Sequence, residues 1–542
     1  MKKLIFLILG LILHVSRIIA CTNVIVTKSA SADGSQYLAY TNDAEYIYHL
    51  KIHIAETHKI GDSIKFTNRS VKSGYIPQVP RTNHVIGFHI NEHQVAIGET
   101  TFTGRLELMN QDAFLEYWHL MLLALERAST AREAIKVITD LVEEYGYASE
   151  GESISIIDKE EAWILEIVGT GIGSKGAVWV AVKIPDGYVS DHANKARIGK
   201  FPLNDPENCI YSANVISFAI EKGYYNPERD GDFLFNEVYC PSTPANLRYC
   251  ETRVWSIFRR FAPSLNLSID YCRGVKGTDP YPLWIKPDRL ISTKDVFYII
   301  RDHYEGTEID MTKGYDAGPF GNPNRNRPLY WSVDSIDCSW ERPISTFNSA
   351  FTFIAQTRSW LPNEIGGLIW YGVDDSYVTC YVPIYCSSRE VHAAFVNGDI
   401  KKYSDDSAWW IFNVVANYCN LRWTDMIKDL HKVQIMLENK FLSEQKNIES
   451  LAMSLFIENK NEAVNFLTNY SLENSGLVMN EWKNLMYHLF TKYNDGYIKN
   501  ENGNPEQFPY SDEYYREVLF HRKSVALPVW DNNENNNEPD SF

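Results

Sequence analysis

Residues Cys21–Thr41 read CTNVIVTKSASADGSQYLAYT, and this stretch decides the expected fold. The β-branched run Asn23–Thr27 predicts one strand, and Gln36–Thr41 predicts a second. Asp33 and Gly34 lie between them, and an Asp-Gly pair between two such runs is a hairpin signal. The sequence therefore predicts an antiparallel hairpin with Cys21 at the start of its first strand.

The segment before this hairpin has the pattern of a signal peptide. Lys2 and Lys3 precede the apolar run Leu4–Leu13, and the small residue Ala20 comes directly before Cys21. The run is shorter than the roughly 20 residues of a bilayer span, and it suits the core of a signal peptide. We therefore expect removal of residues 1–20, export to a periplasmic or extracellular compartment, and a mature chain that begins with Cys21.

Strand and helix signals follow one another along the rest of the first half. A second hairpin is expected over residues 84–98, and helical spacing of apolar residues runs from 110 to 144, with a capping-box pattern at Thr130 and Glu133. Further strands are expected at Ser153–Ile157, Ala162–Val168 and Ala177–Ile184. No crossover helices separate these strands, which favours antiparallel sheets covered by helices, an α+β architecture.

The domain organisation follows from the second half. Residues 200–400 give no clear pattern, whereas the chain turns helical again from about 424 to 493. With neither an internal repeat nor a Gly/Ser linker, we expect one large domain over 21–420 and a helical C-terminal extension over 421–530 packed on it. The tail 531–542, rich in Asn, Glu and Asp, is expected to be disordered.

Composition excludes several classes of protein. A hydrophobic fraction of 45% is that of a globular chain. The net charge of −17, from 52 basic and 69 acidic residues, becomes −20 once Lys2, Lys3 and Arg17 are lost, and it argues against a nucleic-acid partner. The leader is too short to span a bilayer, and no other segment predicts a membrane span. The sequence leaves homo-oligomer formation open.

Common cofactor and metal motifs are absent from the sequence. It contains no Gly-rich phosphate loop, no histidine pair with zinc spacing, no Cys-x-x-Cys and no Gly-x-Ser-x-Gly. We therefore predict neither a cofactor nor a metal. Cys21 remains as the candidate nucleophile, because a free α-amine with a pKa of about 7.7–8.0 on the same residue can take the thiol proton.

Other interpretations of the cysteines stay open at this point. Ile18-Ile19-Ala20-Cys21 also fits a loose lipobox, which predicts a lipid-anchored binding protein without catalysis, and Cys21 can equally be structural. A strand that starts within two residues of Cys21 argues against the flexible tether of a lipoprotein. The other eight cysteines are irregularly spaced, so we favour buried free thiols over short-loop disulfides. They are Cys209, Cys240, Cys250, Cys272, Cys338, Cys380, Cys386 and Cys419.

Three sequence blocks carry a family resemblance. They are Cys21–Ser35, Asn91–Thr101 followed by Gly104-Arg105, and Gly187–Ile198, with weaker similarity at Arg253–Trp255 and Leu361–Trp370. In this order they resemble the PepD-like dipeptidases, which are N-terminal-cysteine peptidases of the N-terminal nucleophile hydrolase superfamily. The resemblance extends from residue 21 to about 390.

The resemblance implies a four-layer αββα sandwich, a dipeptide or short-peptide substrate, and a set of site residues. Cys21 would attack the scissile carbonyl and Asp43 would orient it. The Asn194 side chain and the Thr101 backbone N–H would stabilise the oxyanion, and Arg253 would lie near the site. Taken alone, these residue types also fit a turn aspartate, a surface-loop asparagine and a salt-bridged helical arginine.

One position departs from the related hydrolases. The bile-salt and penicillin-amide hydrolases often place an arginine three residues before the acidic position, where this chain has Tyr40. A tyrosine cannot supply a permanent cation. Either its hydroxyl orients the thiolate, or the cation comes from Arg253 or elsewhere. Hydrolysis of non-peptide amides, such as bile-acid conjugates or N-acyl amino acids, stays the alternative activity.

Overall fold

Two antiparallel sheets stacked on each other form the centre of the computed structural model, which describes residues 20–325 and 329–527. The first sheet contains the predicted hairpin, made by β1 (Ala20–Val26) and β2 (Gln36–Asp43). Its turn is fixed by the Asp33 carboxylate, which accepts from the Ser35 N–H at 3.0 Å, and by Gly34 at φ +83°. Leader residues 1–19 and the tail 528–542 lie outside the described residues.

The first sheet has seven strands and the second has eight. In spatial order the first sheet is β14 (Trp284–Ile285), β12 (Val189–His192), β1, β2, β17 (Phe351–Thr357), β18 (Leu368–Val373) and β19 (Val382–Tyr385). The second sheet is β13 (Cys209–Tyr211), β11 (Ala177–Lys183), β10 (Ala162–Gly169), β9 (Gly151–Ile157), β8 (Ala96–Phe102), β7 (Ile90–Asn91), β6 (Val85–Ile86) and β3 (Ile52–His53). The three strands predicted between 153 and 184 are therefore β9, β10 and β11. The hairpin predicted over 84–98 is interrupted, because a turn with Gly87 at φ +60° divides its first arm into β6 and β7.

A glycine brings the two sheets together beside Cys21. A Cβ on Gly98 in β8 would lie 2.4 Å from Asn23 Oδ1 and 3.1 Å from Tyr40 Cβ. Since real Cβ atoms do not approach that closely, only glycine lets β8 lie directly against β1 and β2. The Asn23 amide then donates to the Glu99 carbonyl at 2.7 Å, which ties the two sheets at this point.

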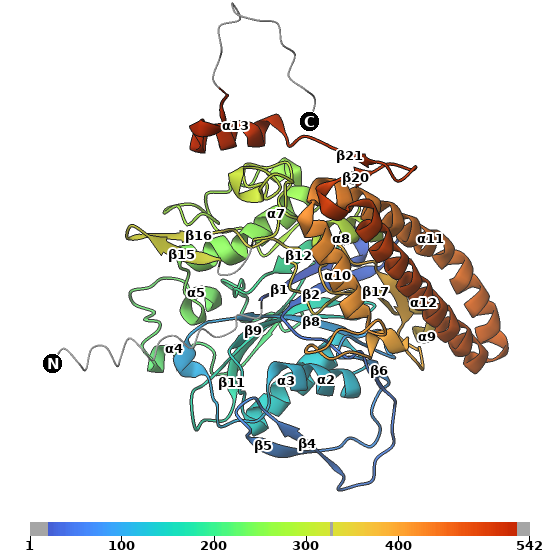
Figure 1. The fold of residues 1–542 in the computed structure, drawn as a ribbon. Helices are drawn as coiled ribbons and strands as arrows, with labels where there is room; N and C mark the ends of the chain where they lie inside the picture. Colours follow the sequence, from blue (N-terminus) through green and yellow to red (C-terminus); the bar gives the residue numbers. More distant parts are fainter. Residues whose placement is uncertain (1–19, 326–328, 528–542) are drawn as a thin grey trace, which may run out of the picture.

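Helices cover both outer faces (Figure 1). On the second sheet lie α2 (Tyr117–Arg127) and α3 (Ala131–Tyr145), whose apolar sides share a core with the strands beneath them. Thr130 caps α3 as predicted, since its side chain accepts from the Glu133 N–H, whereas the Glu133 carboxylate bonds the Ser129 N–H. On the first sheet lie α7 (Thr252–Phe261), α8 (Thr293–Ile300), α10 (Ala408–Leu421), α11 (Trp423–Glu458) and α12 (Lys460–Lys492). The α+β fold with αββα layers is thus confirmed.

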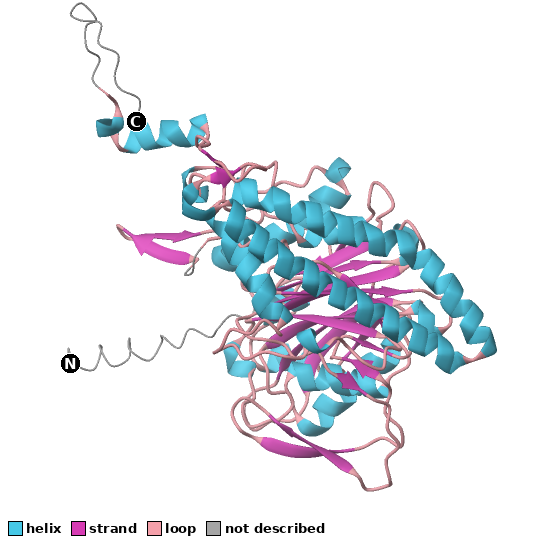
Figure 2. Cartoon of the chain, turned by 45° about the vertical axis from the view of Figure 1, so that its right-hand side comes forward, coloured by secondary structure: helices cyan, strands magenta, loops and turns pink. Residues whose placement is uncertain are grey.

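The helical C-terminal region is tied to the sandwich. The long helices α11 and α12 run side by side (Figure 2), and α12 packs on β19. A buried ion pair joins Arg301, after α8, to Glu438 of α11 at 2.5 and 3.0 Å. Among the described helices, none is both long and apolar enough to cross a bilayer.

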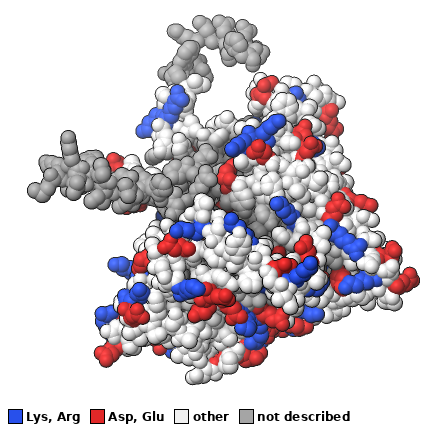
Figure 3. Space-filling view, turned by 90° about the horizontal axis from the view of Figure 1, so that it is seen from below, with Lys and Arg blue, Asp and Glu red and all other residues white. Residues whose placement is uncertain are grey.

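Several shorter elements lie around this frame. They are β4 (Ser63–Thr67), β5 (Ser73–Pro77), α4 (Ser217–Glu221), α5 (Phe235–Tyr239), α6 (Pro244–Asn246), β15 (Tyr330–Val333), β16 (Ile336–Ser339), α9 (Asn363–Gly366), β20 (Ile498–Lys499), β21 (Pro505–Glu506) and α13 (Asp512–His521). All nine cysteines, each within the described residues, are free thiols. On the face shown in Figure 3, acidic and basic side chains of the described residues are interspersed.

Candidate active site

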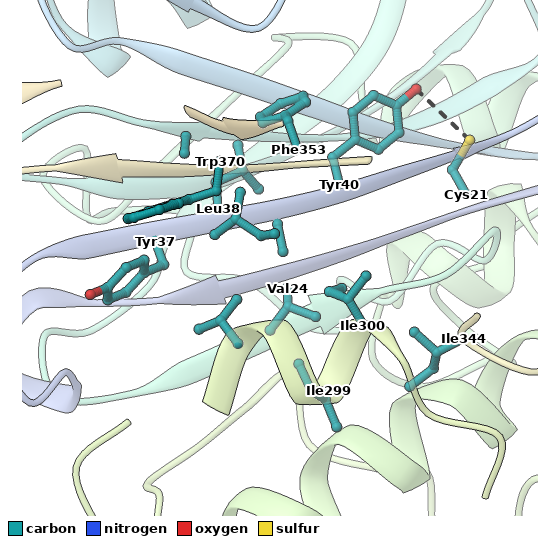
Figure 4. Packing of buried hydrophobic residues seen from close by; sticks show 14 of the residues in the cluster. Cys21, Val24, Tyr37, Leu38, Tyr40, Ile299, Ile300, Ile344, Phe353 and Trp370 are labelled. Atoms are coloured by element: carbon teal, nitrogen blue, oxygen red, sulfur yellow. Dashed lines mark hydrogen bonds between the residues drawn. The ribbon is translucent and has the colours of Figure 1, made fainter. Parts of the chain in front are cut away.

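Cys21 lies near the start of β1, fully buried. Its sulfur lies 3.8 Å from the Tyr40 hydroxyl, 3.6 Å from Glu99 Oε1 and 4.0 Å from Asn42 Nδ2. Figure 4 shows Cys21 and Tyr40 directed towards each other from neighbouring strands. The side-chain groups within hydrogen-bond distance of the sulfur are therefore a phenol, a carboxylate and an amide.

A nearby histidine does not serve as the base. His192 on β12 hydrogen-bonds Thr100 at 2.7 Å and Ser155 at 2.6 Å. Burial lowers its pKa to about 3, so the imidazole is neutral at physiological pH. With both nitrogens bound to hydroxyls, His192 joins β12 to the second sheet and has a structural role.

The main chain of Cys21 is held on both sides. Its nitrogen donates to Asn194 Oδ1 at 3.1 Å, and its carbonyl accepts from Arg253 Nη1 at 2.7 Å. In the full-length chain this nitrogen is the amide that joins Cys21 to Ala20. An amide nitrogen carries no basic lone pair, so the uncleaved chain holds Cys21 in position without the expected base.

Arg253 is buried in α7 and is bonded only to neutral acceptors. Its five N–H donors all have partners, although no carboxylate is among them. The acceptors are Tyr249 O at 3.2 Å, Cys21 O at 2.7 Å, Thr22 Oγ1 at 3.0 Å, Ala193 O at 3.1 Å and Asn194 Oδ1 at 2.9 Å. Burial, and then the neighbouring Arg342 cation, lower the pKa of Arg253. The guanidinium thus places an uncompensated positive charge beside Cys21, and it is not the salt-bridged helical arginine of the alternative.

Asn194 and Thr101 meet at the site. Asn194 has φ +62°, a left-handed conformation that asparagine tolerates better than most residues. Because Arg253 can only donate, the amide atom facing it is Oδ1, and Nδ2 therefore faces Thr101 O at 2.7 Å. The Asn194 side chain links Cys21, Arg253 and Thr101. The oxyanion role of Asn194 and of the Thr101 N–H stays a prediction.

Asp43 reaches Cys21 through its backbone. Its N–H donates to the Cys21 sulfur, whereas its buried carboxylate pairs with Arg342 and accepts from Ser349 Oγ at 2.5 Å. The charge of Asp43 raises the pKa of Arg342. Arg342 also interacts electrostatically with Cys21, so it is a cation of the kind that Tyr40 cannot supply.

Tyr40 belongs to a chain of side-chain hydrogen bonds. The Tyr46 hydroxyl donates to Asn42 Oδ1 at 3.0 Å, Asn42 Nδ2 donates to the Tyr40 hydroxyl at 2.7 Å, and Tyr40 donates to Glu99 Oε1. Burial raises the pKa of Tyr40, which keeps its hydroxyl protonated. The structure therefore has both features left open by the sequence, a phenol at the sulfur and a buried cation, Arg342, at Asp43.

In the full-length chain the thiol itself is neutral. Burial raises the pKa of Cys21 well above its ordinary value, and the charges of Glu99 and Asp43 raise it further. Formation of a thiolate requires a nearby base or an added positive charge. The arrangement can thus perform nucleophilic chemistry only after such a group has been supplied.

Comparison with known proteins identifies the family. The model of peptidase family C69 matches residues 20–435, most of the chain. The chain belongs to peptidase family C69. This membership confirms the resemblance and the N-terminal nucleophile hydrolase fold, and the matched range includes every site residue described above.

Several curated relatives of this C69 chain are named as dipeptidases. A "Probable dipeptidase" of Salmonella dublin is 29% identical over 72% of this chain and 86% of its own length. A "Probable dipeptidase" of Latilactobacillus sakei is 26% identical over 83% of this chain and 90% of its own length. "Dipeptidase A" of Lactobacillus helveticus is 25% identical over 73% of this chain and 81% of its own length.

Three charged residues of this C69 site were not predicted from the sequence. Arg342 lies in the stretch 200–400 that gave no pattern. Glu99 and Glu152 each lie inside a strand of the second sheet, and both are fully buried. The available signal was a glutamate inside a strand that is otherwise apolar or small, since such a residue is seldom buried without a partner.

Proposed function

We propose that this chain is an exported cysteine dipeptidase that becomes active when residues 1–20 are removed. One observation carries the proposal. Cys21 lies near the start of β1, its nitrogen donates to Asn194 Oδ1, and its sulfur lies beside Tyr40 and Glu99. The dipeptidase names of the relatives support the substrate class.

Cleavage after Ala20 would convert the Cys21 nitrogen from an amide into an amine with an ordinary pKa of about 7.7–8.0. That amine takes the thiol proton, and the thiolate attacks the scissile carbonyl carbon. The carbon–nitrogen bond then breaks as the leaving amine receives the proton, which leaves an acyl group on Cys21 as a thioester. Water hydrolyses the thioester and regenerates the thiol.

The site's positive charges favour this sequence of steps. The new ammonium would lie on the same residue as the sulfur, and Arg342 and Arg253 lie nearby, which opposes the effects of burial and of Glu99 and Asp43 on the thiol pKa. Donors aimed at a developing oxyanion typically contribute about 10²–10³ in rate. We assign that role to Asn194 Nδ2 and the Thr101 N–H.

The test compares three forms of the protein: the mature chain beginning at Cys21, the same chain with Cys21→Ala, and a full-length chain in which cleavage is blocked. Dipeptide hydrolysis should fall by about 10³-fold or more in the last two forms. Equal activity of the uncleaved chain would rule out the α-amine as base, and an active Cys21→Ala variant would rule out the nucleophile.

Intact-mass analysis of the exported protein completes the test. A free Cys21 amine supports the proposal, whereas a diacylglyceryl adduct would show the lipid-anchored alternative. Profiling of dipeptides against bile-acid conjugates and N-acyl amino acids separates a peptidase from an amidohydrolase of non-peptide amides.

A further inference from the structure

A carboxylate that forms no ion pair with any described residue lies beside the nucleophile. Glu99 is fully buried, and its Oε1 lies 3.6 Å from the Cys21 sulfur and accepts from Tyr40. Among the described residues, no donor reaches Glu99 Oε2. Arg69 acts on Glu99 electrostatically, but its ion-pair partner is Glu116, and Arg342 is paired with Asp43. Glu99 is therefore the carboxylate of this site that remains for an external cation.

A second buried carboxyl group faces Glu99. Glu152 on β9 accepts from Thr101 Oγ1 at 2.8 Å with its Oε1, and its Oε2 likewise has no donor among the described residues. The Glu99 and Glu152 carboxyl groups lie within hydrogen-bonding reach of one another. Two ionised carboxylates cannot bond each other, so the empty site must hold a positive charge between them, at least a shared proton.

The main-chain nitrogen of Cys21 has an acceptor other than Glu99. It donates to Asn194 Oδ1 at 3.1 Å, and the same oxygen accepts from Arg253 at 2.9 Å. The ammonium created by cleavage would keep this acceptor on the Asn194 side of the site.

A free dipeptide bound for attack by Cys21 would place its α-ammonium within reach of the Glu99 carboxylate. Its α-nitrogen is two bonds from the scissile carbonyl carbon, about 2.5 Å away. With the sulfur about 3–3.5 Å from that carbon, the ammonium lies within roughly 6 Å of the sulfur. A charge-assisted hydrogen bond of about 2.8 Å to the Glu99 carboxylate, whose Oε1 lies 3.6 Å from the sulfur, fits this range.

We propose that Glu99 binds the free α-ammonium group of the substrate's first residue, with Glu152 as the second carboxyl of the same subsite. The inference rests on the proposed dipeptidase function and specifies how it selects substrates. The ammonium replaces the shared proton between the two carboxyl groups. A substrate with an acylated amine has no charge there and only one N–H, so it leaves Glu99 without a cation and is rejected.

The kinetic test uses the mature enzyme with two substrates, L-alanyl-L-alanine and propanoyl-L-alanine, which lacks only the α-amine. Wild type should favour the dipeptide by at least about 100-fold in kcat/KM, since a site built for a polar group strongly rejects an analogue lacking it. Glu99→Gln should lose most of that preference by lowering kcat/KM for the dipeptide alone. Glu143→Gln, which removes one carboxylate from the exposed surface of α3, is the matched control and should behave as wild type.

Alkylation of Cys21 by iodoacetamide distinguishes substrate binding from a role as base. The charge of Glu99 raises the pKa of the Cys21 thiol, so an alkylation rate in Glu99→Gln that equals or exceeds that of wild type supports the ammonium subsite. Equal losses on both substrates together with slower alkylation would show that Glu99 acts on the thiol, and would overturn the inference. The wild-type comparison of the two substrates stands even if the variant does not fold, and equal kcat/KM values there would also overturn it.

Binding to the mature Cys21→Ala protein separates this inference from the proposed function. Calorimetry should show the dipeptide bound at least about 10-fold more tightly than propanoyl-L-alanine, and Glu99→Gln in the same background should abolish the difference. Equal binding overturns the ammonium subsite whether or not any dipeptide is cleaved. Absence of turnover in the wild-type enzyme, with the binding preference intact, would overturn the proposed function alone.

Discussion

Replacing Arg253 by lysine should destabilise the fold although it keeps the positive charge. The guanidinium satisfies five acceptors with five N–H donors, whereas an ammonium has three donors. At least two buried acceptors are therefore left without a partner. Each costs about 1–3 kcal/mol, so Arg253→Lys should lower the free energy of unfolding by about 2–6 kcal/mol.

Urea unfolding followed by tryptophan fluorescence measures this change. Arg259→Lys on the same helix is the matched control. Arg259 is only partly buried and makes one long hydrogen bond, to Glu305 O at 3.5 Å, so its loss should cost less than about 1 kcal/mol. If Arg253→Lys unfolds within 1 kcal/mol of wild type, the five bonds do not hold Cys21, and the positioning argument fails.

Three further predictions concern the same site. Arg342→Met should lower the free energy of unfolding by about 3–5 kcal/mol in urea, because it leaves Asp43 buried without its cation, and adding Asp43→Asn should recover part of the loss. Gly98→Ala should cost about 1–3 kcal/mol in the same assay, because its Cβ would force β8 away from β1, and a neutral result would show that the sheets can separate freely here. Burial raises the pKa of Glu99 from its ordinary 4.5. Since ammonium binding needs the ionised form, kcat/KM for dipeptides should fall as the pH drops through this raised value, whereas propanoyl-L-alanine should lack this acid limb; identical profiles would contradict it.

Local patterns predicted the parts of the fold that form between neighbours in sequence. The hairpin of β1 and β2, the cap of α3 at Thr130, and the strands β9, β10 and β11 all rest on short-range periodicity or turn chemistry. The strands β17, β18 and β19 were not predicted. In β17 every residue of FTFIAQT is buried, so the alternation that marks a half-exposed strand is absent.

The register of β17 also depends on contacts far apart in sequence. Phe353 lies opposite Tyr40, and the two rings pack edge to face with centroids 5.6 Å apart. No window of sequence contains both residues. Tertiary pairing therefore determines where β17, β18 and β19 form in the first sheet, and local propensity alone does not predict them.

The same limit applies to the site. The five residues implied by the resemblance come from different parts of the chain. Asn194 links Cys21, Arg253 and Thr101 by hydrogen bonds, and the Asp43 N–H donates to the Cys21 sulfur. Glu99 and Arg342 were missed, because a buried charged residue looks the same in sequence as one on the surface. Only the structure shows that Arg342 neutralises Asp43 and that no described residue forms such an ion pair with Glu99.

The charges around Cys21 explain why cleavage and substrate binding would act on different atoms. Arg253 has used every donor on neutral acceptors, so its charge can only raise the local potential and cannot bind a substrate carboxylate. Glu99 shares only a proton with Glu152, so a substrate cation can take the place of that proton. Cleavage after Ala20 would create an ammonium that donates to Asn194. A bound dipeptide would bring a second ammonium that donates to Glu99. Because the two acceptors are distinct, an exogenous amine should compete with the dipeptide at Glu99 without quenching the reactivity of the Cys21 thiol.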